Sequence, residues 1–337
     1  MAVNTKSSIP DKVDVLIVGS GPAGIAAANG LKGSGATVLM VDARLKIGFP
    51  LRCGELTGPS FFQLLKMEPR PGWIRCRVQQ NNIILNRPKF EFEASNILSD
   101  AGIIVRTGTS VVGVGSFDGK GRDVTLMSGN EKRAVHARII VAADGISSTT
   151  ARLCGIDTRL KLDDLMSCVA YRLAGVRFED HKRFILDFRE DVRPYYYWVI
   201  PNGKRDANVG VVVTGQRGFA ARRLLDAYMK NNGYFHGGRI VQTVAGSISS
   251  SMPLDKPYSD GLLVTGTAAR FVNAANGAGI RHAVVSGRAA AYVIRKTDDS
   301  EPRADRIGIY RDWLEDIYKI CSETLKKRKE RTAGERT

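Results

Sequence analysis

Unbroken runs of hydrophobic residues mark the start of the chain, as in strands that are buried on both faces of a parallel sheet. Residues 13–18 form an almost continuous apolar run, and a segment of small residues over 25–31 predicts a helix. A second apolar run over 37–42 ends in Asp42. The order strand, helix, strand predicts a βαβ unit of an α/β fold.

Two later segments repeat the pattern of a strand followed by a glycine turn. We expect short strands over 139–142 and 262–265, and a helix of small residues over 280–293. Taken alone, each turn is an ordinary connection between a strand and a helix. The turn residues are Asp144, Gly145, Gly266, Thr267, Gly277, Gly279 and Ile280.

Alternating patterns dominate the middle of the chain. Segments within 167–215 predict strands of a mostly antiparallel sheet, and 219–235 predicts a helix. The strand over 195–201 carries two aromatic faces, of which one is expected to line a cavity. Near the end, a helical stripe of apolar residues comprises Ile307, Tyr310, Leu314, Ile317 and Cys321.

These patterns predict a Rossmann-type nucleotide-binding domain assembled from residues 11–75, 96–165 and 245–300. A mostly antiparallel substrate domain over 166–244 is inserted into it. A C-terminal helix with a basic tail is expected over 301–337.

Composition narrows the function classes. Lys and Arg number 50 against 34 Asp and Glu, a formal charge of +16, which favours acidic partners. Among acidic partners, nucleic acid is the less favoured, because the sequence has no nucleic-acid-binding motif. No apolar run is long enough to span a bilayer, so we expect a cytoplasmic protein, and the basic C-terminus leaves peripheral contact with an anionic membrane open. The five cysteines and four histidines lack metal-ligand spacing, and no metal is expected.

The strongest local motif is Gly19-x-Gly21-x-x-Gly24, which directly follows the first strand. Such glycines permit a tight turn, close approach of a pyrophosphate, and close packing of helix on strand. The helix N-terminus attracts phosphate, and an acid after the second strand can bind a ribose. The motif predicts a dinucleotide site but does not separate FAD from NAD. Its expected ligands are Gly19, Gly21, Pro22, Ala23, Gly24, Asp42 and Ala43.

The three glycine segments, in this order, resemble those of FAD-dependent oxidoreductases of the para-hydroxybenzoate hydroxylase-like superfamily. The resemblance implies that the second turn, at Asp144 and Gly145, lies along the pyrophosphate. The third holds the ribityl chain and directs a helix N-terminus at the flavin. Thr267 stands where the superfamily usually has Asp, so weaker retention of FAD is one expected consequence.

Two short motifs resemble the geranylgeranyl reductase family. They are Gly48-x-Pro50-x-Arg52-Cys53-Gly54-Glu55 and Tyr196-x-Trp198-x-Ile200-Pro201. The resemblance implies that Arg52, Cys53 and Gly54 lie at the flavin, and that Cys53 or Glu55 takes part in catalysis. It also implies that Tyr196, Trp198, Ile200 and Pro201 bind substrate. Arg52 and Glu55 are expected to form an ion pair that fixes the loop.

The leading hypothesis is therefore an FAD-dependent reductase of carbon–carbon double bonds in a prenyl lipid. One alternative is an FAD-dependent monooxygenase of an aromatic or lipid-like substrate, and another is a flavin-binding interaction protein without turnover. The sequence leaves the electron donor open between NAD(P)H and an acidic electron-transfer protein such as a ferredoxin.

Overall fold

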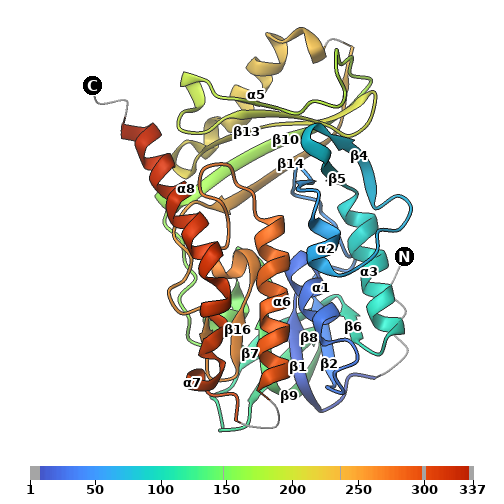
Figure 1. Cartoon of the computed structure of the whole chain (residues 1–337), viewed down its shortest axis with the longest axis vertical. Helices are drawn as coiled ribbons and strands as arrows, with labels where there is room; N and C mark the ends of the chain where they lie inside the picture. Colours follow the sequence, from blue (N-terminus) through green and yellow to red (C-terminus); the bar gives the residue numbers. More distant parts are fainter. Residues whose placement is uncertain (1–7, 147, 236, 298–300, 334–337) are drawn as a thin grey trace.

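A parallel sheet lies at the centre of the nucleotide-binding part of the computed structural model, which describes residues 8–146, 148–235, 237–297 and 301–333 (Figure 1). Its parallel strands have the order β16-β9-β1-β2-β6, and antiparallel strands β7, β8 and β15 extend it to eight. The strands are β1 (Lys12–Val18), β2 (Val38–Asp42), β6 (Ile104–Thr107), β7 (Thr109–Val114), β8 (Arg122–Ser128), β9 (Glu131–Ala142), β15 (Tyr258–Ser259) and β16 (Leu262–Val264).

The helices α1 (Pro22–Leu31) and α6 (Ile280–Lys296) lie side by side over this sheet (Figure 1). Glycine makes their close approach feasible, because a Cβ atom added to Gly287 of α6 would lie 2.2 Å from the carbonyl oxygen of Ala23. The prediction of a short strand over 139–142 was wrong in its length. Strand β9 has 12 residues, because its first half pairs with β8 and only its second half enters the parallel core.

The second sheet is antiparallel, as predicted, with the order β11-β12-β13-β10-β14. Helix α5 (Ala221–Lys230) packs on its outer side, where the rings of Tyr197 and Tyr228 stack at 4.1 Å. The edge strand β14 was not predicted, and it crosses the expected domain boundary at residue 245. The strands are β10 (Leu165–Ala174), β11 (Ile185–Asp187), β12 (Tyr197–Pro201), β13 (Asp206–Thr214) and β14 (Arg239–Ser249).

A small antiparallel sheet, β3-β5-β4, connects the two larger sheets. The aromatic rings of Phe61 and Phe62 pack beside it against Phe90 and Trp73, so this pair belongs to the hydrophobic core. The elements are β3 (Leu56–Thr57), α2 (Phe61–Leu65), β4 (Ile74–Val78), β5 (Asn82–Leu85), α3 (Arg87–Asp100) and α4 (Thr149–Leu153).

The C-terminal segment contains α7 (Ala304–Ile307) and α8 (Glu315–Ala333), and α8 reaches from the parallel sheet up to the second sheet (Figure 1). All five residues of the predicted apolar stripe are buried. The predicted fold class is therefore confirmed: a Rossmann-type α/β part, an antiparallel sheet and a C-terminal helix.

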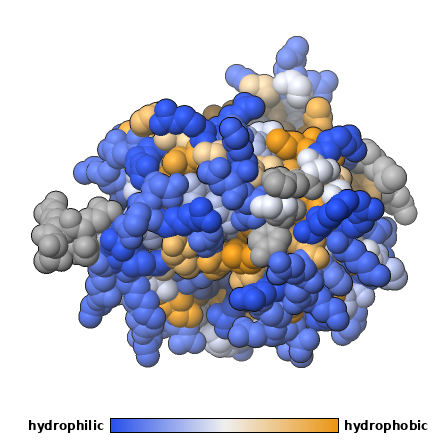
Figure 2. Space-filling model, turned by 90° about the horizontal axis from the view of Figure 1, so that it is seen from above, coloured by the Kyte–Doolittle hydropathy of each residue, from blue (hydrophilic) through white to orange (hydrophobic). Residues whose placement is uncertain are grey.

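Hydrophilic side chains cover most of the end of the molecule that carries the second sheet, and apolar side chains gather between them in patches (Figure 2). None of the helices within the described part of the chain combines the length and the apolar character needed to cross a lipid bilayer.

Candidate active site

Three glycine turns meet at one edge of the parallel sheet. They follow β1, β9 and β16, which are neighbours, and the carboxyl ends of parallel strands lie at the same edge. A Cβ atom added to Gly19 would lie 2.4 Å from the carbonyl oxygen of Ala143, and one added to Gly145 would lie 3.9 Å from the Thr267 hydroxyl. One added to Gly266 would lie 3.0 Å from a side chain of α1. Segments far apart in the sequence thus form one continuous rim.

This rim suits the phosphates and sugar of a dinucleotide. Gly24 packs so closely that an added Cβ would lie 1.8 Å from the carbonyl oxygen of Gly19, whereas Gly21 faces open space. Helix α1 begins without a side-chain cap and has Pro22 in its first turn, which leaves backbone N–H groups available to an anion. Among the described residues, the buried Oδ1 atom of Asp144 has no hydrogen-bond partner, so it can accept a hydrogen bond from a bound group.

Asp42 lies at the end of β2, close to the first turn. Its carboxylate accepts hydrogen bonds from the Ser20 N–H at 2.8 Å and from two guanidinium nitrogens of Arg44 at 2.7 and 2.9 Å. Burial alone would raise the pKa of Asp42, but the bonds to Arg44 and Ser20 lower it overall. Asp42 is therefore ionised, and Arg44, which the sequence reasoning missed, is its main partner. Ala43 lies between the two.

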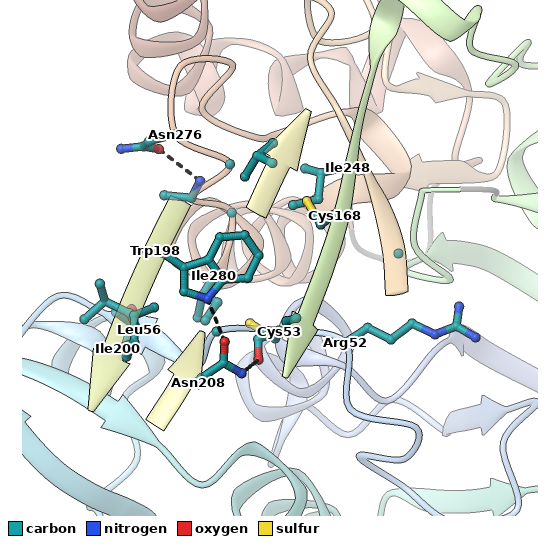
Figure 3. A pocket seen from close by; sticks show the side chains of 18 of the residues that line it. Arg52, Cys53, Leu56, Cys168, Trp198, Ile200, Asn208, Ile248, Asn276 and Ile280 are labelled. Atoms are coloured by element: carbon teal, nitrogen blue, oxygen red, sulfur yellow. Dashed lines mark hydrogen bonds between the residues drawn. The ribbon is translucent and has the colours of Figure 1, made fainter. Parts of the chain in front are cut away.

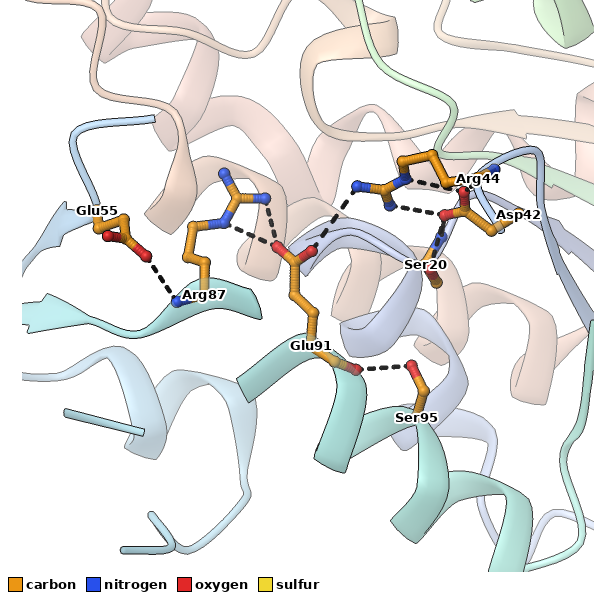
Figure 4. A network of polar contacts seen from close by, with 7 residues as sticks. All are labelled: Ser20, Asp42, Arg44, Glu55, Arg87, Glu91 and Ser95. Atoms are coloured by element: carbon orange, nitrogen blue, oxygen red, sulfur yellow. Dashed lines mark hydrogen bonds and ion pairs between the residues drawn. The ribbon is translucent and has the colours of Figure 1, made fainter. Parts of the chain in front are cut away.

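A series of charged side chains extends from Arg44 toward the loop that contains Cys53 and Glu55 (Figure 4). Glu91 of α3 has no exposed surface, and it pairs with Arg44 at 3.9 Å and with Arg87 through a short contact. Burial would lower the pKa of the Arg87 guanidinium, but the Glu91 carboxylate raises it above its usual value, with a further contribution from the neighbouring Cys53 thiol. Arg87 thus places a permanent positive charge beside Cys53.

The predicted ion pair between Arg52 and Glu55 was wrong. Glu55 is completely buried, where it pairs with Arg172 of β10 and with Arg75 of β4, the latter at 3.4 Å. It also accepts a hydrogen bond from the backbone N–H of Arg87 at 2.8 Å. Glu55 therefore joins the second sheet, the small sheet and α3, and it does not line the cavity described below.

We predict that Glu91→Gln lowers the free energy of unfolding by about 3 kcal/mol, because a neutral amide leaves the guanidinium groups of Arg44 and Arg87 without their shared counter-ion. Urea denaturation measures the change. Glu93→Gln on the same helix is the matched control, since its pair with Lys89 is partly exposed and is worth about 0–1 kcal/mol. Equal losses in the two variants would contradict a structural role for the buried network.

A cavity of about 590 Å³ lies between the second sheet and the rim of the parallel sheet (Figure 3). The aromatic face of β12 lines one wall, and the turns at 52–54 and 276–280 line the others. Pro201 is buried at the end of β12, outside the lining. Of the expected site residues, the cavity brings together Arg52, Cys53, Gly54, Tyr196, Trp198, Ile200, Gly277, Gly279 and Ile280.

The remaining wall comes from strands whose role was not anticipated. Strand register places Asn208 opposite Ile200 and Gly210 opposite Trp198. A Cβ atom added to Gly210 would lie 2.1 Å from the indole ring, so only glycine leaves room for Trp198 to lie across the sheet. The period-2 alternation of the strands predicted within 167–215 was the signal that could have identified most of these residues. They include Cys168, Phe184, Leu186, Asn208, Val212 and Gly246.

Hydrogen bonds fix the two aromatic side chains of β12. The indole N–H of Trp198 donates to the side-chain oxygen of Asn208 at 2.6 Å, and the Asn208 amide donates to the carbonyl oxygen of Cys53 at 3.5 Å (Figure 3). The Tyr196 hydroxyl donates to the carbonyl oxygen of Asn276. Strand β12 is thereby connected to both turns that face it, and the cavity wall is held in one geometry.

Two thiols line the cavity in different surroundings. Burial raises the pKa of Cys168 to about 12, so this thiol stays protonated at neutral pH. Cys53 accepts a hydrogen bond from the backbone N–H of Glu55 at 3.2 Å and lies beside the Arg87 guanidinium. Cys53 therefore lies in the more polar surroundings of the two thiols.

The N-terminus of α6 opens onto the same cavity through Gly279 and Ile280. It has no side-chain cap and no acidic residue in its first turn. Burial lowers the pKa of His282, in that turn, to about 4, so its imidazole is neutral at pH 7. The positive end of the helix dipole is consequently available to stabilise negative charge on a bound ring.

Comparisons with known proteins agree with this geometry. The family model of the geranylgeranyl reductase catalytic domain matches residues 164–248, and that of an FAD binding domain matches 12–47. Digeranylgeranylglycerophospholipid reductase of Methanosphaerula palustris is 31% identical over 83% of this chain and 75% of its own length. The enzyme of that name, numbered 1, from Methanopyrus kandleri is 30% identical over 92% of this chain and 88% of its own length.

Among solved structures, a geranylgeranyl bacteriochlorophyll reductase-like protein from Thermoplasma acidophilum superposes with a TM-score of 0.89. It is 26% identical, and the match covers 95% of this chain and 87% of that one. The para-hydroxybenzoate hydroxylase-like fold is thus confirmed, and with it FAD as the cofactor. The chain is an enzyme that belongs to the geranylgeranyl reductase family of FAD-dependent oxidoreductases.

Proposed function

We propose that this enzyme saturates carbon–carbon double bonds in the prenyl chain of a lipid. The observation that carries the proposal is the aromatic and aliphatic cavity between β12, the Cys53 turn and the N-terminus of α6. A prenyl chain offers no polar group along its length, so its site has to be apolar and largely preformed. The names of the relatives from Methanosphaerula palustris and Methanopyrus kandleri support the same class of substrate.

The residues of the rim would hold the cofactor. The first turn, with Gly21 and the N-terminus of α1, would bind the pyrophosphate, the turn at Asp144 would lie along it, and Thr267 would bind the ribityl hydroxyls. When bound and reduced, FAD supplies a hydride to one carbon of a double bond. The hydroxyl of Thr267 can hydrogen-bond but carries no charge, unlike the Asp that is usual in the superfamily.

A proton has to reach the second carbon, and we assign its delivery to Cys53. Its thiol lines the cavity, and the Arg87 charge would stabilise the thiolate left after transfer. Water then restores the proton. Trp198 and Tyr196 would hold the chain against this face, while the apolar wall excludes other proton donors.

The direct test uses FAD-loaded protein that has been chemically reduced under anaerobic conditions and mixed with candidate prenyl lipids. We expect product masses that increase by two hydrogens for each double bond reduced. A product that instead gains oxygen when air is admitted would favour a monooxygenase. A protein that binds FAD but changes no lipid would favour a non-catalytic role.

For the electron donor, the formal charge of +16 supports an acidic electron-transfer protein over NAD(P)H. Flavin reduction by a reduced ferredoxin should then slow steeply as salt is raised, because screening weakens long-range attraction. Fast, salt-insensitive reduction by NAD(P)H alone would contradict this choice.

A further inference from the structure

A second cavity, of about 280 Å³, lies beside the main one. Residues 188–190 and 193–195 form most of its wall, and Arg331 of α8 closes it. Arg193, Arg331 and Glu190 bring two guanidinium groups and one carboxylate to this small space. The guanidinium of Arg189 lies over the Tyr228 ring, on the α5 side of the second sheet. Neither the FAD site nor the proposed proton transfer makes use of it.

The charges of the second cavity are not balanced. Arg189 pairs with Asp187 at 2.9 Å, and Arg193 pairs with Glu190 at 3.0 Å. Arg331 has no carboxylate within 4.0 Å among the described residues, and it donates only to the carbonyl oxygen of Ala275 at 3.3 Å. Arg331 thus brings a positive charge that has hydrogen-bonding capacity to spare.

A neighbouring arginine shows that this end of α8 is held in place. Arg328 lies one helical turn before Arg331, and it donates to the hydroxyl of Ser250 at 2.6 Å and to that of Tyr195 at 3.3 Å. It too lacks a carboxylate partner within the described part of the chain. These hydrogen bonds of Arg328 hold the positively charged end of α8 against the second sheet.

The two cavities share a wall. The ring of Phe188 lies 5.3 Å from that of Tyr196, which lines the main cavity, and the Arg331 guanidinium lies 5.2 Å from the Phe188 ring. Ala275, which accepts the bond from Arg331, directly precedes Asn276 of the main cavity. The apolar main cavity and the cationic second cavity are therefore adjacent to each other.

We propose that the second cavity binds the phosphate group of the lipid whose prenyl chain occupies the main cavity. This inference rests on the proposed function. Arg331 supplies the unpaired charge, while Arg193 adds hydrogen-bond donors at the rim. Guanidinium groups bind phosphate through paired, charge-assisted hydrogen bonds, so the site would also fix which end of the substrate enters first.

The test compares two substrates on FAD-loaded enzyme: a prenyl glycerophospholipid and the free prenyl alcohol of the same chain. For Arg331→Gln we expect KM to rise at least tenfold for the phospholipid, with kcat unchanged, and no change for the alcohol. Lys327→Gln is the matched control, because it removes the same charge from an exposed position of α8. Circular dichroism checks that the helix persists.

The outcomes separate the two proposals. If neither substrate gains hydrogen, the proposed function fails. If the wild-type enzyme reduces both and Arg331→Gln changes both equally or neither, the phosphate site fails. An equal effect of Lys327→Gln would mean that general surface charge acts instead, which also overturns the site. Inorganic phosphate at 10 mM identifies the source: protection of wild-type but not Arg331→Gln protein against heat, together with equal KM values of the two proteins for the phospholipid, would assign the site to free phosphate and overturn a headgroup role.

Discussion

Gly21→Val is expected to weaken FAD binding by about 100-fold, or ~2.7 kcal/mol, while the protein without cofactor remains folded. The backbone at Gly21 is extended, with φ −76° and ψ −175°, so a side chain causes no strain there. A Cβ atom would meet nothing within 4 Å in the protein itself, but it would occupy the space that the pyrophosphate needs. Flavin fluorescence titration measures the affinity, and urea denaturation measures the stability.

Two other glycines give this experiment its controls. Gly233→Val also adds a side chain where nothing lies within 4 Å, but far from the nucleotide turns, and it should leave FAD affinity unchanged. Gly24→Ala should instead destabilise the protein, because its Cβ would lie 1.8 Å from the carbonyl oxygen of Gly19. Full FAD affinity in Gly21→Val would contradict the assignment of the first turn to the pyrophosphate.

Cys53→Ala is expected to lower kcat by about 100-fold or more, the usual contribution of a general acid, without loss of FAD. The thiol supplies the proton that completes the addition, and alanine has none to give. The measurement is turnover of a prenyl lipid under anaerobic conditions, together with the flavin absorbance spectrum.

Cys168→Ala separates chemistry from packing. Cys168 lines the same cavity, but burial raises its pKa to about 12, whereas Cys53 lies beside the Arg87 guanidinium. We expect this variant to keep most of its activity. Similar losses in both variants would show that the thiols only fill space.

Much of the fold follows from short-range patterns. The apolar run over 13–18 and the small residues after it predicted β1 and α1, although the helix begins earlier, at Pro22. The alternating aromatic residues predicted that one face of β12 would line a cavity, and Tyr196 and Trp198 lie there. Such patterns predict secondary structure because a buried strand or helix needs apolar residues at fixed local intervals.

The partners of the charged residues could not be predicted in this way. Glu55 was expected to pair three positions away, with Arg52, but its partner Arg172 lies 117 positions further along the chain. Burial explains the difference, because a carboxylate with no exposed surface needs several donors, and only the docking of β10 and α3 supplies them. Arg44 and Glu91 were missed for the same reason.

By itself, the sequence determined the class of fold, because glycine turns and buried strands constrain the residues that form them locally. The resemblance of its short motifs to known reductases indicated the cofactor and the family. The tertiary structure alone decided which side chains share a cavity: Asn208 beneath Trp198, Arg87 beside Cys53, and Arg331 behind Phe188. Those contacts depend on strand register and on how separate layers dock. No local sequence pattern predicts that residues so far apart in the chain will be in contact.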